Sequence, residues 1–446
     1  MHIKQVTIKN FRCFEELTVN LNPDVNIFVG NNGSGKSAVL DAIAAAIYPY
    51  IAKFQEIADT NFSDIPPIFQ GDIPVQIENK LKTTVEFFIS SIPNVETTSD
   101  SYLDFLNRQV IYKQAANGND NTRLKRTRSQ KRNSLFDRNR NVLKNNLQSI
   151  PVLFILVYYK SNRNLTNITD IENISNPHFE RLDAFKNALD ATANFTDLTN
   201  WFFVREFQEL REGKKKGDIN FELPDLKQIR IAISTIIAPN ARVYFTQKTS
   251  AQLMVEWETE TGEKIELSLN QLSSGYRNML ALVMDFARRL AQANPQMANP
   301  LEAEAVLMID ELDLHLHPTW QQKIIPDLRK VFPNTQIIAT THSPEIVTTV
   351  ERHQVKILEN YQIKECPTPT RGRSSSDIVS DVLGLEKLRP DTEESRTLTA
   401  LFNAIDNGNL EEAKQFRDKL QDWEHFDPDL IRADMQIHRL QRKVNA

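Results

Sequence analysis

Apolar and polar residues alternate over residues 2–9 and again over 17–21, which is the pattern of half-buried strands. A short, mostly apolar run at residues 25–29 leads directly into Gly30. Residues 38–47 then form an apolar, alanine-rich segment that is typical of a buried helix. The start of the chain is therefore predicted to contain a strand, a glycine loop and a helix in succession, which is the order that a phosphate-binding loop requires.

Later parts of the chain repeat these patterns. A continuous apolar run predicts a fully buried strand at residues 151–159. A further buried strand is predicted at 304–309 and another strand at 335–340. Helical spacing of apolar residues predicts helices within residues 178–211, at 227–238, after Gly275, at 318–331 and from Pro344 onward.

The middle of the chain contains an aromatic helix and a hairpin. The predicted helical segment 178–211 has aromatic residues that we expect to form a core face, namely Phe195, Trp201, Phe202, Phe203 and Phe207. Residues 241–247 and 252–269 are predicted to form hairpin strands, with a turn around Thr261 and Gly262.

The segment from about residue 375 to the end is predicted to be helical. Apolar residues recur at helical spacing between Leu398 and Ile405. Asn409 and Glu412 form a capping-box pattern at the start of a further helix, and Asp427–Pro428 marks the start of another. We expect these amphipathic helices either to pack on the rest of the chain or to expose an apolar groove to a partner.

Composition narrows the class of protein. The chain has 446 residues and a net charge of −5, which excludes a basic nucleic-acid coat over the whole molecule. Its two cysteines, Cys13 and Cys366, are too few for a disulfide scaffold or a cysteine-based zinc site. No apolar run reaches about 18 residues, and the N-terminus lacks the apolar core of a signal peptide. We therefore expect a cytoplasmic protein without a membrane partner.

Positive charge is concentrated in residues 123–144, where Asp137 is the one acidic residue. The basic residues proposed here for nucleic-acid contact are Arg123, Lys125, Arg126, Arg128, Lys131 and Arg132. Such a stretch binds phosphates without reading sequence if it contacts nucleic acid. The alternative is a solvated loop, and the sequence leaves both interpretations open.

The strongest chemical signal is the glycine loop, which fits the pattern G-x-x-x-x-G-K-[ST] in full. Its glycines let backbone N–H groups turn toward phosphate oxygens, and the next helix presents its positive end there. Lys36 is expected at the β and γ phosphates and Ser37 on Mg²⁺, so ATP and Mg²⁺ are the expected ligands. The predicted ATP-binding residues are Gly30, Asn31, Asn32, Gly33, Ser34, Gly35, Lys36, Ser37 and Ala38. A plain glycine turn before a helix is the alternative, and the preceding strand argues against it.

Two acids end the predicted strand 304–309. A carboxylate at a strand tip can complete the Mg²⁺ shell, and we assign that role to Asp310. The next carboxylate can activate a water for attack on the γ phosphate, and we assign that role to Glu311. Many strands end in acidic residues, so Asp310 and Glu311 indicate a nucleotide site only in combination with the glycine loop.

Two further strings have a functional and a structural interpretation. Residues 271–276 precede a helix and fit a plain serine N-cap as well as a functional site. His342 ends the strand that follows the two acids, and this position favours a catalytic role. His315 and His317 alternate on the loop after the acids; with no third metal ligand apparent, we favour a structural role for them.

Taken together, these strings resemble the ATP-binding-cassette (ABC) ATPase head, and they occur in that family's order. The glycine loop resembles the Walker A loop, and the strand with Asp310 and Glu311 resembles Walker B. Leu312 and Asp313 correspond to the D-loop and His342 to the switch histidine. The signature corresponds to Leu272, Ser273, Ser274, Gly275 and Tyr276. The resemblance implies an α/β fold with a mixed sheet, a helical lateral insertion and a C-terminal helical tail, with Lys36, Glu311 and His342 as catalytic residues.

Heads of this family sandwich two ATP molecules, with the signature of one subunit facing the phosphate loop of the other. The resemblance therefore implies that Ser274 and Gly275 act in trans and that the chain forms at least a head-to-tail dimer. The signature departs from LSGGQ at Ser274 and Tyr276. This substitution is usual among SMC-, RecF- and OLD-like heads and leaves the rate of hydrolysis open.

Other strings narrow the subtype. Residues 8–14, IKNFRCF, resemble the opening of RecF- and SMC-type heads, which implies that Arg12 reaches the nucleotide. The long stretch between Ser37 and Leu272 lacks heptads and resembles a RecF-like lateral lobe. The LDLHLHP string after Glu311 resembles the PtuA-like ATPase subunits of Septu anti-phage systems and of some retrons.

That resemblance implies an ATP-driven switch subunit that controls a separate HNH nuclease of the PtuB type. In retrons it also implies a reverse transcriptase and its DNA–RNA product as partners. A RecF-like DNA repair clamp without a nuclease is the alternative function. A transporter ATPase is disfavoured by the long insertion and by the RecF-type start.

These assignments divide the chain into four parts. Residues 1–110 and 241–355 are expected to form the two halves of the ATPase head. Residues 111–240 are expected to form the basic and helical insertion, and 356–446 the C-terminal helical tail that docks a partner.

Overall fold

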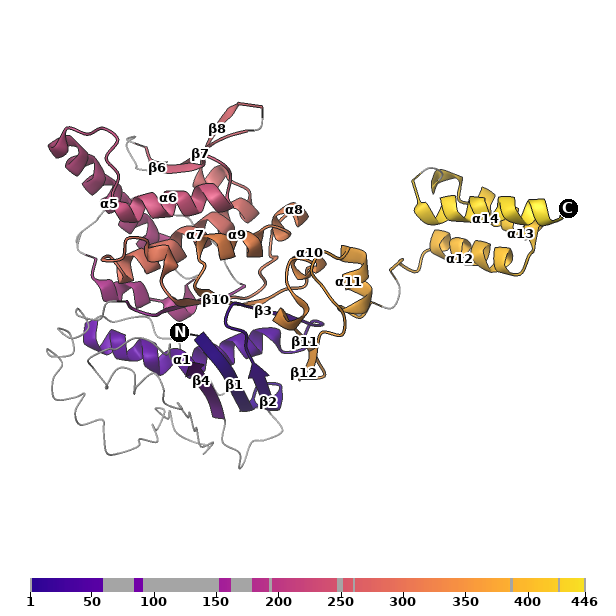
Figure 1. Ribbon diagram of the computed structural model, residues 1–446, viewed down its shortest axis with the longest axis horizontal. Coiled ribbons are helices and arrows are strands. Elements are labelled where there is room, and N and C mark those ends of the chain that lie inside the picture. The colour runs from indigo at the N-terminus through magenta and orange to yellow at the C-terminus, as the bar shows by residue number, and fades with distance from the viewer. Residues whose placement is uncertain are drawn as a thin grey trace. The chain divides into compact units, whose positions relative to one another are not determined.

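The computed structural model describes residues 2–58, 84–90, 152–161, 179–191, 195–246, 252–259, 261–385, 388–423 and 426–444. Most of the predicted strands are present, and they form three sheets (Figure 1).

The first sheet is antiparallel and follows the order β2–β1–β4. Its strands are β1 His2–Phe11, β2 Phe14–Asn20 and β4 Thr84–Ser90. The predicted alternation is confirmed over the second half of β1, because Val6 and Ile8 are fully buried while Lys9 is exposed. A bulge between Ile3 and Gln5 shifts the register before it, so that Ile3 is buried and Lys4 is exposed. Val6 pairs with Val19 of β2, so both strands turn their apolar residues to one face.

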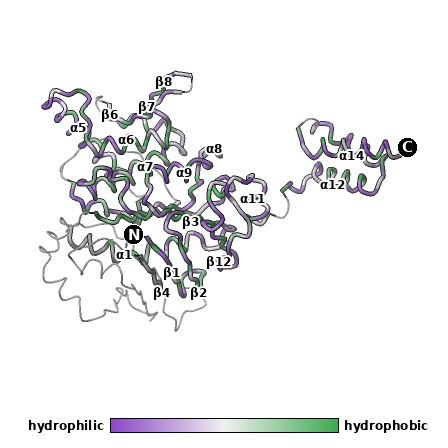
Figure 2. Tube along the Cα trace, viewed as in Figure 1, coloured by the Kyte–Doolittle hydropathy of each residue, from purple (hydrophilic) through white to green (hydrophobic). Residues whose placement is uncertain are grey.

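The central sheet has six strands in the order β12–β11–β3–β10–β9–β5. They are β3 Val25–Val29, β5 Ile155–Tyr159, β9 Ala305–Ile309, β10 Thr335–Thr340, β11 Val355–Glu359 and β12 Gln362–Glu365. All pairs are parallel except β11 with β12, so the predicted mixed sheet is confirmed. Every residue of β3, β5, β9 and β10 is buried. Buried strands are mostly apolar, but β3 contains Asn26 and β10 contains Thr335, Gln336 and Thr340; Figure 2 colours the chain by hydropathy.

This topology positions the functional strings. Strands β3, β10 and β9 are parallel neighbours, so their carboxyl ends lie at the same edge of the sheet. The segments that follow them begin at Gly30, Thr341 and Asp310. Ligands of open parallel sheets bind at this edge.

Helices cover both faces of the central sheet. Helix α1 Lys36–Ala58 lies on the side of the first sheet, whereas α6 Pro224–Ile236, α7 Ser274–Ala293 and α9 Ile324–Val331 lie on the other (Figure 1). Helix α5 Phe195–Lys216 packs against α6 and α7. Single 3-10 turns occur at Arg181–Phe185, Ala188–Asp190, Leu269–Gln271, Pro300–Glu302, Arg352–Gln354 and Gln421–Trp423.

The single helix predicted at 318–331 is wrong. The structure has α8 Pro318–Gln321 and α9 Ile324–Val331, separated at Gln322 and Lys323. Pro326 explains the break, because its ring would clash with the carbonyl of Gln322 in a continuous helix and it has no N–H to donate. The helix predicted from Pro344 is present as the short α10 Pro344–Val347.

The predicted aromatic core face of α5 is correct in part. Trp201 and Phe202 are buried, whereas Phe207 is 53% exposed. Phe207 lies five residues after Phe202, which places it about 140° around the helix from that residue. The guanidinium of Arg211 covers its ring at 5.4 Å instead.

A third, lateral sheet contains β6 Arg242–Phe245, β7 Leu253–Glu258 and β8 Lys264–Ser268 in sequence order. The predicted hairpin is confirmed, because β7 and β8 are antiparallel and turn at Gly262, whose φ is +79°. Glycine adopts this left-handed conformation without strain.

The chain divides into two compact units, Met1–Ile378 and Val379–Ala446. Helix α11 Ser375–Asp381 spans the boundary. The second unit contains α12 Glu393–Asp406, α13 Leu410–Asp418 and α14 Pro428–Val444, around a core that includes Leu398, Leu401, Leu430 and Ile437. Asn409 caps α13 and Asp427 precedes α14, as the sequence predicts.

Two segments belong to a different part of the fold from the one that the sequence-based division assigns to them. Strands β11 and β12, at residues 355–365, pair within the central sheet, although the predicted tail begins at 356. Strand β5, within the predicted insertion 111–240, pairs with β9 of the same sheet.

Among the helices that the structure describes, none is long and apolar enough to cross a membrane.

Candidate nucleotide-binding site

The glycine loop lies between the end of β3 and the start of α1. Gly30, Gly33 and Gly35 have φ angles of +149°, +79° and +101°, conformations that side chains disfavour. The N–H of Ser34 donates to the carbonyl of Asn31 at 3.1 Å, which closes the loop on itself. Val39 donates to the carbonyl of Gly35, so the first helical turn begins directly at the loop.

Close packing gives a second reason for two of these glycines. A Cβ atom on Gly30 would strike the carbonyl oxygen of Leu358 in β11. A Cβ atom on Gly35 would lie 2.6 Å from the Phe14 ring and 2.8 Å from the Cys13 Sγ. The loop is therefore held between β11 and the turn that joins β1 to β2.

Lys36 folds back over the loop that it follows. Its Nζ donates to the carbonyls of Gly30 at 2.8 Å and Asn31 at 3.0 Å, and the residue is buried. Burial lowers the pKa of Lys36, while the nearby carboxylates of Asp310 and Glu311 oppose that shift. The buried hydroxyl of Ser34 has no hydrogen-bond partner among the described residues. A buried cation and an unused hydroxyl on one loop suit an anionic ligand.

Ser37 and Asp310 meet at the edge of the central sheet, although 273 residues separate them. The Ser37 hydroxyl donates to Asp310 Oδ1 at 3.0 Å. Thr340, at the end of β10, donates to the same oxygen at 2.6 Å. A hydroxyl beside a carboxylate is the oxygen donor set that Mg²⁺ favours, so the residues present fit this ion.

Glu311 follows Asp310 in a left-handed conformation, with φ at +50°. Its backbone N–H donates to the hydroxyl of Thr340 at 2.7 Å. Such a conformation costs a non-glycine residue free energy and is held by its surroundings, as at many functional sites. The geometry places two acids in succession beside the phosphate loop.

Asp313 of the predicted D-loop contacts the segment that contains the predicted switch histidine. Its Oδ1 accepts from the hydroxyl of Thr341 at 2.6 Å and from the N–H of His342 at 3.2 Å. His342 itself is exposed. Ser343, the next residue, donates to the Gln321 side chain at 2.7 Å. The ends of β9 and β10 are thus linked by side chains.

The predicted signature lies at the start of α7. Ser273 is the N-cap of this helix, and its hydroxyl accepts from the N–H of Tyr276 at 3.5 Å. Ser273 and Ser274 are exposed, whereas Leu272 and Gly275 are buried. A Cβ atom on Gly275 would strike the carbonyl oxygen of His315, so the glycine is required by a close approach.

The signature is not joined to the phosphate loop within one chain. Among the described residues, no hydrogen bond connects the Ser273 or Ser274 side chain with Gly30–Ser37. The serine N-cap interpretation of this string is confirmed at Ser273, whereas Ser274 is exposed and its functional role stays a prediction.

Arg12 lies on the turn between β1 and β2 with φ at +48°. Its guanidinium donates to Asp41 of α1 at 2.5 Å, one turn beyond Ser37. Tyr158 of β5 is buried near the same Asp41. Burial, together with the Asp41 and Asp310 carboxylates, raises the pKa of Tyr158 well above its usual range. Arg12 therefore lies close to the start of α1, and its contact with nucleotide stays a prediction.

The two loop histidines have structural contacts. His317 is the N-cap of α8, and its Nδ1 accepts from the N–H of Thr319 at 3.4 Å. His315 has φ at +63°, which turns its carbonyl toward Gly275. These contacts agree with the structural role favoured by the sequence. The basic residues from Arg123 to Arg132 lie outside the described residues.

Three residues of this site have no role in the sequence-based prediction. Thr340 orients Asp310 and the Glu311 backbone, Asp41 receives Arg12, and Gln321 joins α8 to Ser343. The position of Thr340 at the tip of a strand that follows the two acids was a usable signal. Asp41 and Gln321 gave none, because their partners are distant in sequence.

The sequence of the chain matches a family model and several known proteins. The family model described as the AAA ATPase domain matches residues 1–347. A protein described as the retron Vc95 probable ATPase, from Vibrio cholerae serotype O1 biovar El Tor, is 27% identical over 94% of this chain and 86% of its own. The Septu protein PtuA of Bacillus thuringiensis is 23% identical over 87% of this chain and 85% of its own.

Among solved structures, an SMC head bound to the C-terminal winged-helix domain of ScpA superposes with a TM-score of 0.41 and 14% identity. The match covers 82% of this chain and 96% of the SMC head.

Proposed function

Because the chain belongs to the AAA ATPase domain family and is an ATPase, we propose that it is the ATP-driven switch subunit of an anti-phage defence complex. One observation carries this proposal. The ATPase domain model ends at residue 347, whereas the similarity to the retron ATPase covers 94% of the chain. The shared sequence therefore extends beyond the ATPase domain itself.

The site geometry supports the following chemistry. Lys36 and the N–H groups of the loop bind the β and γ phosphates of ATP. Ser37 and Asp310 hold Mg²⁺, which when bound neutralises charge on the phosphate oxygens. Glu311 orients and deprotonates the attacking water, and His342 contacts the γ phosphate.

The exposed signature supports a head-to-tail dimer. Ser273 and Ser274 project from the N-terminal end of α7, where the helix dipole favours an anion. Their hydroxyls are available to the phosphates of ATP bound by a second copy. Two copies would then complete two sites, each with the phosphate loop of one chain and the signature of the other.

The second compact unit offers a partner surface. Phe426 just before α14 is 86% exposed, and Ile431 and Met435 within α14 are 44% and 57% exposed. Arg432 and Arg439 lie beside them and are also exposed. We assign this face to an HNH nuclease of the PtuB type, and a retron reverse transcriptase with its DNA–RNA product completes the proposed set of partners.

A RecF-like DNA repair clamp that acts without a nuclease is the second candidate. The basic residues between Arg123 and Lys144 favour DNA contact in both cases. The two functions differ in the presence of a nuclease partner.

The test is a tagged pull-down of the Glu311→Gln variant, expressed from its native locus with the neighbouring genes intact. The substitution should slow hydrolysis by roughly 10²- to 10⁴-fold and hold the closed dimer. Mass spectrometry and nucleic-acid staining then identify what co-purifies. A stoichiometric HNH nuclease supports the defence switch, and a reverse transcriptase with a DNA–RNA hybrid specifies a retron. A clean dimer that holds ATP, with or without DNA but without nuclease, would favour the repair clamp.

A further inference from the structure

Three aromatic rings from three separate elements meet at the first turn of α7. Tyr276 of the signature stacks on Trp257 of β7, with ring centroids 6.0 Å apart and planes inclined by 12°. The same tyrosine packs against Trp320 of α8, with centroids 4.3 Å apart and planes inclined by 59°. Aromatic pairs at these separations attract one another beyond their buried area.

The contacts of Tyr276 with Trp257 and Trp320 hold the signature in place, in addition to the contacts at the start of α7. The Ser273 cap and the approach of Gly275 to the His315 carbonyl fix the end of the helix. Tyr276 restrains the rotation of the helix, because its ring contacts a tryptophan of β7 and another of α8. Ser274 is two residues before Tyr276, so a shift of the ring displaces the exposed serine hydroxyl.

The Trp320 end of the stack leads to the nucleotide site of the same chain. The neighbouring Gln321 donates to the carbonyl of Leu316 at 2.8 Å and accepts from Ser343 at 2.7 Å. Ser343 follows the predicted switch histidine, His342. Helix α8 is thereby tied to the loops after β9 and β10.

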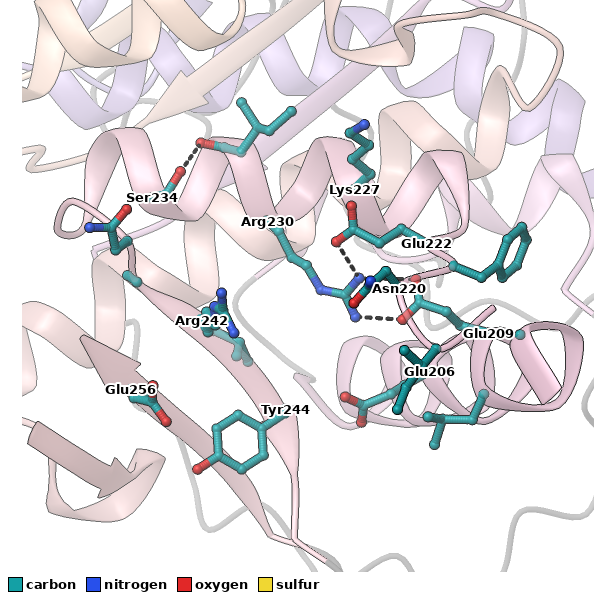
Figure 3. Close-up of a pocket in the computed structure, with 18 of the residues that line it drawn as sticks. Glu206, Glu209, Asn220, Glu222, Lys227, Arg230, Ser234, Arg242, Tyr244 and Glu256 are labelled. Carbon is teal, nitrogen blue, oxygen red and sulfur yellow. Dashed lines mark hydrogen bonds and ion pairs between the residues drawn. The ribbon is translucent and has the colours of Figure 1, made fainter. Parts of the chain in front are cut away.

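The Trp257 end leads away from the nucleotide, into the lateral sheet. Trp257 contributes to the wall of an open groove of about 1340 Å³ between α5, α6, β6 and β7 (Figure 3). Within this groove Arg230 bonds Glu209 at 2.7 Å and Glu222 at 3.2 Å. The Arg230–Glu209 pair joins α6 to α5, and these two helices line the groove together with the lateral sheet.

We propose that Trp257 and Trp320 are positioning residues that act through Tyr276 on Ser274. The lateral sheet thereby sets the rate at which ATP bound by the other copy of the chain is cleaved. This inference rests on the proposed trans dimer. It also gives a reason for the tyrosine that replaces the usual signature glutamine, because Tyr276 makes ring–ring contacts with both tryptophans that a glutamine side chain would not make.

The test uses dimers assembled from two differently tagged copies and purified through both tags. One copy carries Glu311→Gln, so only the ATP in the other copy is cleaved, and that ATP faces the signature of the Glu311→Gln copy. Trp257→Leu is placed either in the Glu311→Gln copy or in the cleaving copy. Both dimers contain the same substitutions, so any loss of folding stability affects them equally.

The measurement is the single-turnover rate of γ-phosphate cleavage at saturating ATP. We expect Trp257→Leu to lower this rate roughly tenfold in the Glu311→Gln copy, because small displacements of a catalytic contact cost at least that much. In the cleaving copy it should leave the rate unchanged. Trp257→Phe in the first placement should restore most of the rate, and ATP affinity should not change in either.

Tyr244→Leu is the matched control, because Tyr244 is an aromatic residue of the same lateral sheet whose hydroxyl bonds Glu266. It should leave the rate unchanged in both placements. An equal loss in both placements of Trp257→Leu, or no loss in either, would overturn the inference alone. Cleavage by a dimer with Glu311→Gln in both copies, or failure of the tagged copies to co-purify with ATP, would overturn the proposed function as well.

Discussion

Thr340 performs two tasks with one hydroxyl group at the edge of the central sheet. The hydroxyl donates to Asp310 Oδ1 at an oxygen–oxygen distance of 2.6 Å, and it accepts from the N–H of Glu311 at 2.7 Å. The first contact orients the carboxylate that also receives Ser37, and the second holds the left-handed backbone of Glu311. One residue outside the predicted machinery thus aligns two residues within it, as supporting contacts do around many catalytic groups.

Lys36 gives the sharpest prediction for a single residue. Lys36→Ala should lower ATP affinity by roughly 100-fold or more, because it removes a charge-assisted contact to phosphate from a buried position. A fluorescent ATP analogue measures the affinity by equilibrium titration. Lys9→Ala, which removes an exposed ion pair with Glu16, should leave it unchanged. Undiminished binding by Lys36→Ala would refute the phosphate-loop assignment.

Among the elements, α7 joins the signature to the core of the head. Its Asp285 is buried and accepts from Arg288 at 2.6 Å and from Arg289 at 2.8 Å. The hydroxyl of Tyr159, the last residue of β5, also donates to Asp285 at 2.8 Å. Arg289 donates in addition to the carbonyl of Ala184 at 2.7 Å. This buried cluster fixes the helix to the sheet, so the exposed serines at its start are presented from a rigid support.

Asp285→Asn should therefore destabilise the protein by roughly 3–5 kcal/mol at pH 7, because it leaves two buried guanidinium groups without their counter-charge. Burial raises the pKa of Asp285, but Arg289 and Arg288 outweigh it and lower the pKa to about 2. A pKa below its unfolded value stabilises the fold above that unfolded value, and this stabilisation is lost on acidification. Urea unfolding should show the difference between the two proteins narrowing as the pH falls from about 5 toward 2.

Glu16→Gln is the control for this experiment, because the Lys9–Glu16 pair lies on the surface of the same unit. It should cost less than about 1 kcal/mol at every pH. A cost of similar size for Asp285→Asn would show that the buried cluster does not anchor α7.

At the scale of the whole molecule, the nucleotide site belongs to one compact unit. All its described residues, from Arg12 to Ser343, lie within Met1–Ile378. The second unit has its own core, in which Leu401 and Ala413 are fully buried. Each unit therefore buries its own apolar side chains, and ATP chemistry and partner binding are separable parts of the proposed function.

A chain ending at Leu385 should keep ATP binding and hydrolysis but lose the partner nuclease in the pull-down. Full-length Ile431→Glu should behave likewise, since it adds a charge to an exposed apolar position without disturbing the core. ATP turnover and mass spectrometry of the captured proteins provide the two measurements. Retention of the nuclease by both variants would place its binding surface in the first unit.

The amino-acid sequence by itself determined the parts of this protein that depend on near neighbours. The phosphate loop could be predicted because its glycines, Lys36 and Ser37 all lie within residues 30–37, between a strand and a helix. Strand β9 could be predicted because its five residues are all apolar, and β3 because it is mostly apolar and leads directly into the glycine loop. The capped starts of α13 and α14 follow from local side-chain contacts in the same way.

Only the tertiary structure decided what distant residues do together. The parallel order of the central sheet brings Ser37 to Asp310 and both to Thr340. The His315 carbonyl explains why position 275 needs a glycine, and Tyr276 contacts two tryptophans from separate elements. Strand β11 joins the sheet beside β3, which no local pattern indicated. These contacts link residues that are far apart in the chain. Their contribution to stability depends on how the elements pack, and the spacing of residues along the sequence does not reveal that packing.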